Sequence, residues 1–105
     1  MKKRLLIVED NARLLSVISV YLEKAGFDVM TARDGDEAIL KLAETIPDLI
    51  VSDIMMPGID GFAFVAQVRA NPRTDLIPII FLTAKECRED RIRGFRAGVD
   101  AYFVK

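Results

Sequence analysis

The residues RLLIVED, numbered 4–10, carry the clearest sign of the architecture, because an aliphatic run leads directly into an acidic pair. An apolar run without alternation is typical of a strand that is buried on both faces, as in parallel sheets. Further strand-like runs occur at residues 27–31, 49–52, 78–82 and 101–104. We therefore predict five strands. The second is more polar than the others, which favours a position at an edge of the sheet.

Helical patterns fill the gaps between these runs. They are predicted over residues 11–24, between a cap at Asp36 and Pro47, over 62–70 and over 88–97. One stripe of the first helix is apolar and consists of Leu14, Leu15, Ile18, Tyr21 and Leu22. The last helix is expected to turn Ile92 and Phe95 inward. Strands that alternate with helices of these lengths favour parallel βαβ units, with helices on both faces of a twisted sheet.

The composition indicates one globular domain, residues 1–105, in a chain that is 51% apolar and 30% charged. The net charge is −1, so we expect no direct nucleic acid binding by this segment. No apolar run approaches the roughly 18 residues of a membrane span, and no signal peptide is expected. The single Cys87 fits a reducing cytoplasm. The absence of histidine excludes His-based catalytic triads and His-rich metal sites.

Polar residues stand where four of the predicted strands end. Glu9 and Asp10 follow the first strand, Asp53 the third, Thr83 the fourth and Lys105 the fifth. In open parallel sheets the ligand site lies outside the carboxyl ends of the strands, so we expect these five side chains to converge. Taken singly, each has an ordinary structural explanation. The acidic pair or Thr83 could cap a helix, and the lysine could be solvated.

Three converging carboxylates repel one another, which indicates a divalent cation between them. Oxygen ligands without histidine or cysteine suit Mg²⁺, or Mn²⁺ in its place. We predict that Asp10 and Asp53 hold this ion, with Glu9 assisting through water and the backbone carbonyl of Met55 within reach. A carboxylate beside Mg²⁺ can also attack phosphorus and form an aspartyl phosphate.

Four motifs resemble the receiver domain of bacterial two-component response regulators. They are the acidic pair at 9–10, DIMMPGIDG at 53–61, the Thr83-Ala84 pair and GVDAYFVK at 98–105. The match begins at residue 4 and reaches the last residue. It implies a flavodoxin-like, doubly wound, five-stranded parallel sheet with strand order 2-1-3-4-5. The family's fifth helix is absent from this chain, so the domain is expected to be truncated after its fifth strand.

The resemblance implies a phosphorylation-dependent switch. Asp53 would be the phosphoacceptor and would take a phosphoryl group from the phosphohistidine of a sensor histidine kinase or phosphotransfer protein. Glu9 and Asp10 would be the acidic metal pair. An output domain would follow at the C-terminus of the full protein, and the fourth helix and fifth strand could form a homodimer. Enzyme activity would be limited to self-phosphorylation and autodephosphorylation.

The same resemblance assigns roles around the phosphoryl group. Thr83 would be the hydroxyl that moves toward it, and Tyr102 the coupled aromatic that turns inward. Lys105 would pair with the phosphoryl oxygens, and Ala84 would leave access to the acyl phosphate. Pro57-Gly58 most simply makes the tight turn beside the site.

Two other classes of protein stay open from the sequence. One is a pseudo-receiver, an interaction module that never binds phosphate, although the intact strand-end residues argue against it. The other is an aspartyl-phosphate phosphatase. Such enzymes typically carry a second aspartate two residues after the nucleophile, and here that position is Met55.

Overall fold

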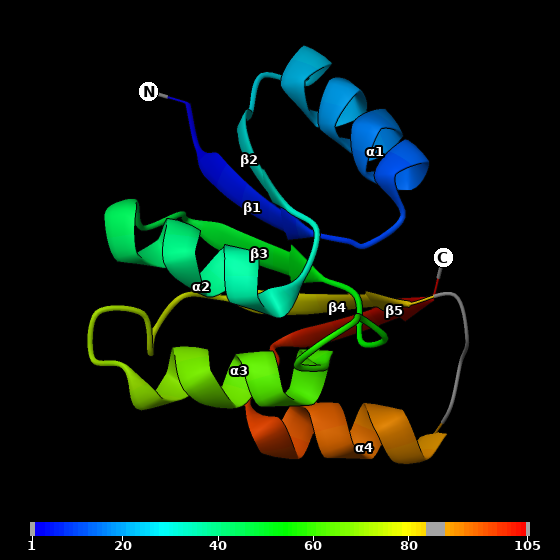
Figure 1. Cartoon of the computed structure of the whole chain (residues 1–105), viewed down its shortest axis with the longest axis vertical. Coiled ribbons are helices and arrows are strands. Elements are labelled where there is room, and N and C mark those ends of the chain that lie inside the picture. Colours follow the sequence, from blue (N-terminus) through cyan, green and yellow to red (C-terminus); the bar gives the residue numbers. More distant parts are fainter. Residues whose placement is uncertain (1, 84–87, 105) are drawn as a thin grey trace.

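The computed structural model describes residues 2–83 and 88–104, which form one parallel sheet flanked by helices (Figure 1). The strand order is β2-β1-β3-β4-β5, and every neighbouring pair is parallel. The predicted fold class is thus confirmed, and β2 lies at an edge as expected. The strands are β1 (Arg4–Val8), β2 (Asp28–Ala32), β3 (Leu49–Ser52), β4 (Ile79–Thr83) and β5 (Ala101–Val104).

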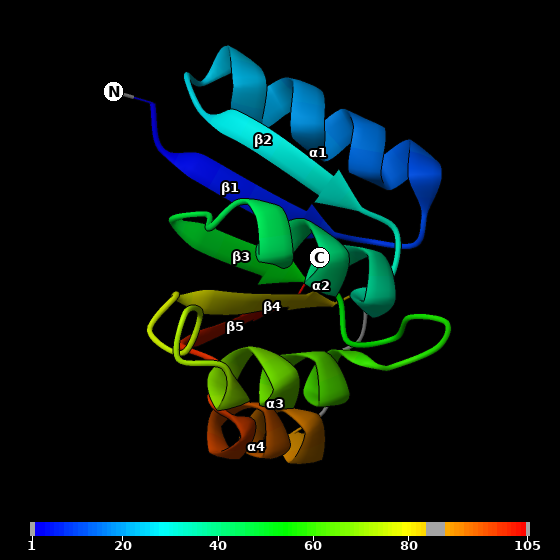
Figure 2. The ribbon, with the colours of Figure 1, turned by 60° about the vertical axis from the view of Figure 1, so that its left-hand side comes forward.

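Four helices are described, and they cover the two faces of the sheet unequally (Figure 2). They are α1 (Ala12–Lys24), α2 (Gly35–Glu44), α3 (Gly61–Ala70) and α4 (Arg88–Ala97). One face of β1, with Leu5 and Ile7, packs against Leu15 of α1. The other face, with Leu6 and Val8, belongs to the larger core under the remaining helices. Among the described residues no helix has both the length and the apolarity that crossing a bilayer requires.

Aspartate and asparagine side chains fix where three helices begin, since their oxygens accept from backbone N–H groups of the first turn. The Oδ1 atoms of Asn11, Asp34 and Asp60 accept from the backbone nitrogens three residues later at 3.1, 2.7 and 2.9 Å. The prediction that Asp36 caps α2 was therefore wrong. The helix also ends at Glu44, earlier than predicted, because Thr45 is already extended. Strands β2 and β4 begin and end one residue later than predicted.

Helix α4 contradicts the expected inward positions of Ile92 and Phe95, whose side chains are 43% and 47% exposed. Gly94 takes the inward position instead, and it is the buried residue of this helix. A Cβ atom added at Gly94 would lie 3.2 Å from the Phe81 ring. The helix axis therefore lies close to the sheet, which turns the larger side chains to the flanks. Tyr21 of α1 is likewise exposed, off the predicted apolar stripe.

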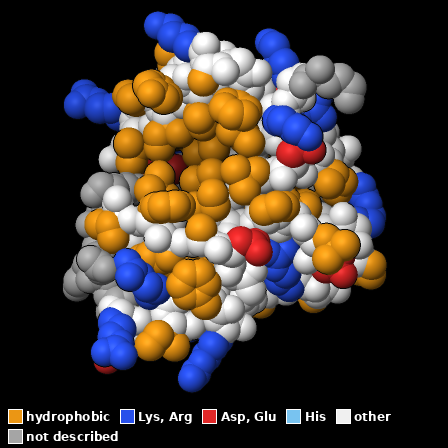
Figure 3. All heavy atoms as spheres, turned by 180° about the vertical axis from the view of Figure 1, so that it is seen from behind, with side chains coloured by type: hydrophobic (Ala, Val, Ile, Leu, Met, Phe, Trp, Pro, Cys, Tyr) orange, Lys and Arg blue, Asp and Glu red, His pale blue; other side chains and the backbone are white. Residues whose placement is uncertain are grey.

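The sheet face on the α1 side has no helix over β4 and β5 among the described residues. The register places Leu82 beside Phe103 on this face, and Phe103 is exposed. Val17, Val20 and Tyr21 of α1 are exposed as well. Figure 3 shows apolar side chains gathered into one patch on the side of the molecule turned away from the viewer in Figure 1.

Candidate functional site

The site lies at the carboxyl ends of β1 and β3, which are neighbours in the sheet. Val8 and Ser52 are paired in the ladder, so the residues that follow them emerge side by side. The backbone nitrogen of Asp53 donates to Val8 O at 3.0 Å, and that of Glu9 donates to Ala32 O at 3.0 Å. The main chain is therefore held by strand-like hydrogen bonds at the point where the acidic side chains leave it.

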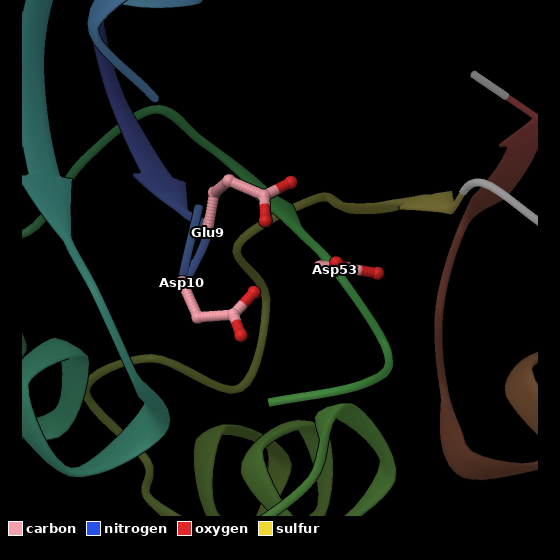
Figure 4. Close-up of side chains that lie close together, drawn as sticks. All are labelled: Glu9, Asp10 and Asp53. Carbon is pink, nitrogen blue, oxygen red and sulfur yellow. The ribbon is translucent and has the colours of Figure 1, made fainter. Parts of the chain in front are cut away.

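Three carboxylates meet at this edge (Figure 4). One oxygen from each of Glu9, Asp10 and Asp53 lies within 4.8 Å of the others. Glu9 is buried, Asp53 is half-buried and Asp10 is exposed. Both acidic residues after β1 extend from one loop toward the segment that carries Asp53. An oxygen-only group of this kind, open on one side to solvent, fits a hard divalent cation that keeps several of its waters.

Backbone N–H groups orient two of the three carboxylates. The Asp53 Oδ1 atom accepts from Ile54 N at 2.7 Å, and the Glu9 Oε2 atom accepts from Asn11 N at 3.2 Å. Both donors belong to loops that follow the strands. The backbone N–H groups therefore fix the direction in which these two carboxylates point.

Gly61 is a site residue that the sequence reasoning missed. Its nitrogen donates to Ile54 O at 2.7 Å, so the first turn of α3 lies against the backbone that carries Asp53. A Cβ atom at this glycine would lie 2.7 Å from Asp53 O and 2.8 Å from the Ile54 Cα atom. Neither backbone atom can move aside without displacing the chain around it. The one local signal is its position directly after the capping residue Asp60.

Gly61→Ala is expected to lower the free energy of unfolding by about 1–3 kcal/mol, because the added methyl group overpacks the loop. It should also weaken Mn²⁺ binding, since Asp53 must shift with its backbone. Urea unfolding and a metal titration measure the two effects. Gly26→Ala is the control: it strains a positive φ of 101° in a position with open space around it. It should leave the metal affinity unchanged. Equal metal affinities in both variants would contradict this prediction.

Pro57 and Gly58 form the loop beside the site. Gly58 has a φ of 76°, in the left-handed region that favours glycine. Pro57 lines a hollow of about 500 Å³, together with Asp10, Arg33, Asp34 and Glu37. The hollow adjoins the acidic group through Asp10. Met55, in the same loop, has an exposed side chain.

The remaining predicted site residues lie on β4 and β5 or outside the described residues. Thr83 ends β4 and is buried, and β4 pairs with β3. Tyr102 of β5 is also buried, so its ring already occupies an inward position. Ala84 and Lys105 lie outside the described residues, so the structure does not place their predicted roles.

Comparisons with known proteins cover nearly the whole chain. The model of the response regulator receiver domain matches residues 5–105. The phosphate regulon transcriptional regulatory protein PhoB of Rhizobium meliloti is 40% identical over 105 residues, which are all of this chain and 46% of that protein. The chain thus spans less than half the length of this curated relative. The chemotaxis response regulator CheY4 of Vibrio cholerae superposes with a TM-score of 0.94 at 34% identity, over 100% of this chain and 88% of that one.

A second solved structure bears on the metal. The Mn²⁺-bound form of the response regulator Rcp1 superposes with a TM-score of 0.89 at 27% identity. It covers 98% of this chain and 81% of that one. A fold of this kind thus accommodates a divalent cation in that protein, and the acidic group here could hold one.

Proposed function

The chain belongs to the response regulator receiver domain family, whose members act in phosphorylation-dependent signalling, and we propose that Asp53 is its phosphoacceptor. The observation that carries this proposal is the convergence of Asp53 with Glu9 and Asp10 at the carboxyl edge of the sheet. Asp53 stands at the end of the central strand β3 and is half-buried, so a donor can approach it. Its carboxylate is oriented by Ile54 N.

We propose that the acidic group holds Mg²⁺, or Mn²⁺ in its place. Asp10 and Asp53 would be direct ligands, Glu9 would act through water, and the Met55 carbonyl would complete the protein's share. The ion would supply positive charge that neutralises the carboxylates and the incoming phosphoryl oxygens. The convergence of the three carboxylates, with one oxygen of each within 4.8 Å of the others, supports this assignment, because a cation offsets their mutual repulsion.

The proposed reaction transfers a phosphoryl group from a histidine nitrogen to a carboxylate oxygen. A carboxylate oxygen of Asp53 attacks phosphorus, the P–O bond forms, and the P–N bond of the phosphohistidine donor breaks. The imidazole leaves with the electron pair of that bond. Thr83 would donate its hydroxyl to a phosphoryl oxygen, and Lys105 would pair with another, while Ala84 leaves room for the group. Pro57 and Gly58 shape the loop that forms one wall of the site around the phosphoryl group.

The phosphoryl group adds negative charge and acceptor oxygens at Asp53. We propose that Thr83 contacts this group in one state of the domain, and that Tyr102 passes the change to the surface of α4 and β5. A contact made in one state alone is what shifts the population. The partners would be a sensor histidine kinase or phosphotransfer protein and an output domain in the full protein. A second copy could bind through α4 and β5. PhoB, the relative described above, is a transcriptional regulatory protein.

The direct test is incubation with Mg²⁺ and a small phosphodonor, followed by intact-mass measurement. A receiver gives about one base-labile phosphoryl adduct per chain, and a chelator prevents its formation. Continuous release of phosphate over many equivalents would instead indicate a phosphatase. A chain that forms no adduct under these conditions would be a pseudo-receiver.

A further inference from the structure

Two arginines of α4 lie over aromatic rings of the core. The Arg93 Cζ atom lies 4.0 Å from the centroid of the Phe62 ring, and the Arg91 Cζ atom lies 5.2 Å from that of Tyr102. Phe81 stands between the two rings, at centroid distances of 5.5 Å from Phe62 and 6.4 Å from Tyr102, in edge-to-face geometry. Two guanidinium groups of one helix therefore cover the two outer rings in a row of three.

These contacts help to position α4 on the sheet. Gly94 is the buried residue of the helix, and its larger apolar side chains Ile92 and Phe95 are exposed. Ala97 of α4 packs against the main core beside the close approach at Gly94, and the two guanidinium groups add contacts to aromatic rings. A guanidinium group over a ring face is attracted by the negative face of the ring, and this attraction is directional. A shift of the Phe62 ring is thus a shift of the surface on which Arg93 rests.

Phe62 is linked to Asp53 by two short hydrogen bonds. Ile54 N donates to Asp53 Oδ1 at 2.7 Å, and Gly61 N donates to Ile54 O at 2.7 Å. Gly61 precedes Phe62 in the chain. A change at the Asp53 carboxylate is therefore two hydrogen bonds and one peptide unit away from the ring that Arg93 covers. Thr83 and Tyr102 are not members of this chain of hydrogen bonds, although the Phe62 ring neighbours Tyr102 through Phe81.

We propose that Arg93 is a positioning residue that couples phosphorylation of Asp53 to α4 through Phe62, by a route separate from Thr83 and Tyr102. The proposal rests on the proposed function of Asp53. Formation of the acyl phosphate withdraws negative charge from the Asp53 carboxyl group that accepts from Ile54 N, so that hydrogen bond changes between the two states. The change reaches the first turn of α3, and the Arg93 contact transmits it to α4. The route is contiguous, but coupling has to be measured to establish it.

The experiment measures hydrogen exchange of the α4 amides before and after phosphorylation with Mg²⁺ and a small phosphodonor. Arg93→Gln removes the charge, and Arg93→Lys keeps it. Arg96→Gln removes the same charge from the same helix at a position for which no ring contact is recorded among the described residues. We expect Arg93→Gln to reduce the phosphorylation-induced change in α4 exchange at least about twofold. Arg93→Lys should keep most of this change, and Arg96→Gln all of it, at equal adduct occupancy.

Two further variants separate the route from a general weakening of α4. Phe62→Leu should reduce the change as Arg93→Gln does, and the double variant should lose no more than either single one. Thr83→Ala combined with Arg93→Gln should lose more than either, because the routes are separate. An undiminished response in Arg93→Gln with full adduct, or an equal loss in Arg96→Gln, would overturn the proposal and leave Asp53 as phosphoacceptor. A wild-type chain that forms no adduct would overturn both.

Discussion

Asp53→Asn is expected to abolish the phosphoryl adduct and leave the fold intact. The amide side chain lacks the ionised oxygen that attacks phosphorus, so intact-mass measurement should detect no adduct at any Mg²⁺ concentration. Asparagine still offers an Oδ1 atom to Ile54 N, so the hydrogen bond recorded at 2.7 Å can persist. The loop that carries the site should therefore keep its conformation. Loss of adduct in this variant then reports on chemistry rather than on unfolding.

The same variant has a second expected effect without metal. Three carboxylates lie within 4.8 Å of one another, and removal of one relieves their repulsion. In the presence of a chelator, Asp53→Asn should be more stable than the wild type by up to about 1 kcal/mol. Added Mg²⁺ should stabilise the wild type more than the variant, and so narrow the difference between their free energies of unfolding. Urea unfolding with and without Mg²⁺ measures both quantities.

Asp75→Asn is the matched control, because Asp75 is exposed in the loop before β4, at the opposite edge of the sheet. It should form the adduct as the wild type does. If Asp53→Asn still gained one phosphoryl group, peptide mapping would locate another acceptor and the assignment of Asp53 would be wrong. A chelator-independent adduct would argue against the metal instead.

The sheet was predictable because its signals are local. The aliphatic run at residues 4–8 ends in an acidic pair, and similar runs recur between helical patterns, so topology rules predicted a parallel sheet with helices on both faces. The strand order came from the resemblance to the receiver family. The position of α4 was not predictable in this way. Its apolar residues suggested that Ile92 and Phe95 face inward, but the close approach at Gly94 depends on the Phe81 ring, which is far away in the sequence.

The candidate site was likewise predictable from the sequence only in part. The meeting of Glu9, Asp10 and Asp53 follows from parallel strands, because their carboxyl ends share one edge. The fit of Gly61 against the Asp53 backbone has no counterpart in residue periodicity. The stacking of Arg93 on Phe62 has no counterpart in residue periodicity either. From the sequence, the phenylalanine is interpreted as a core residue and the arginine as a solvated charge. Both depend on the distances between elements, which only the folded chain defines.

Arg69 organises the edge of the sheet opposite the site. Its guanidinium group donates to the backbone oxygens of Asp75, Ile77 and Gly98 at 2.9, 2.6 and 2.7 Å, and to the Asp100 carboxylate at 3.0 Å. One side chain of α3 thus ties together the loop before β4, the residue that follows α4 and the start of β5. The side chain is 22% exposed, and its bonds to the backbone oxygens of Ile77 and Gly98 are partly buried.

Arg69→Met is expected to lower the free energy of unfolding by about 3 kcal/mol, because it keeps the apolar stem but leaves shielded carbonyl groups without their donor. That is a large part of the roughly 5–15 kcal/mol that stabilises a typical domain. Urea unfolding at neutral pH measures the loss. Below its unfolding transition the variant should still form the Asp53 adduct with Mg²⁺, since the affected loops lie away from the carboxyl ends of β1 and β3.

Asp100→Asn separates the carbonyl contacts from the ion pair. The Asp100 side chain is 58% exposed, and an exposed ion pair contributes at most about 1 kcal/mol. Asparagine can still accept from Ile79 N, which donates to the Asp100 carboxylate at 2.8 Å. Asp100→Asn should therefore cost much less than Arg69→Met. Equal losses in the two variants would show that the charge pair, rather than the donation to backbone oxygens, holds this edge together.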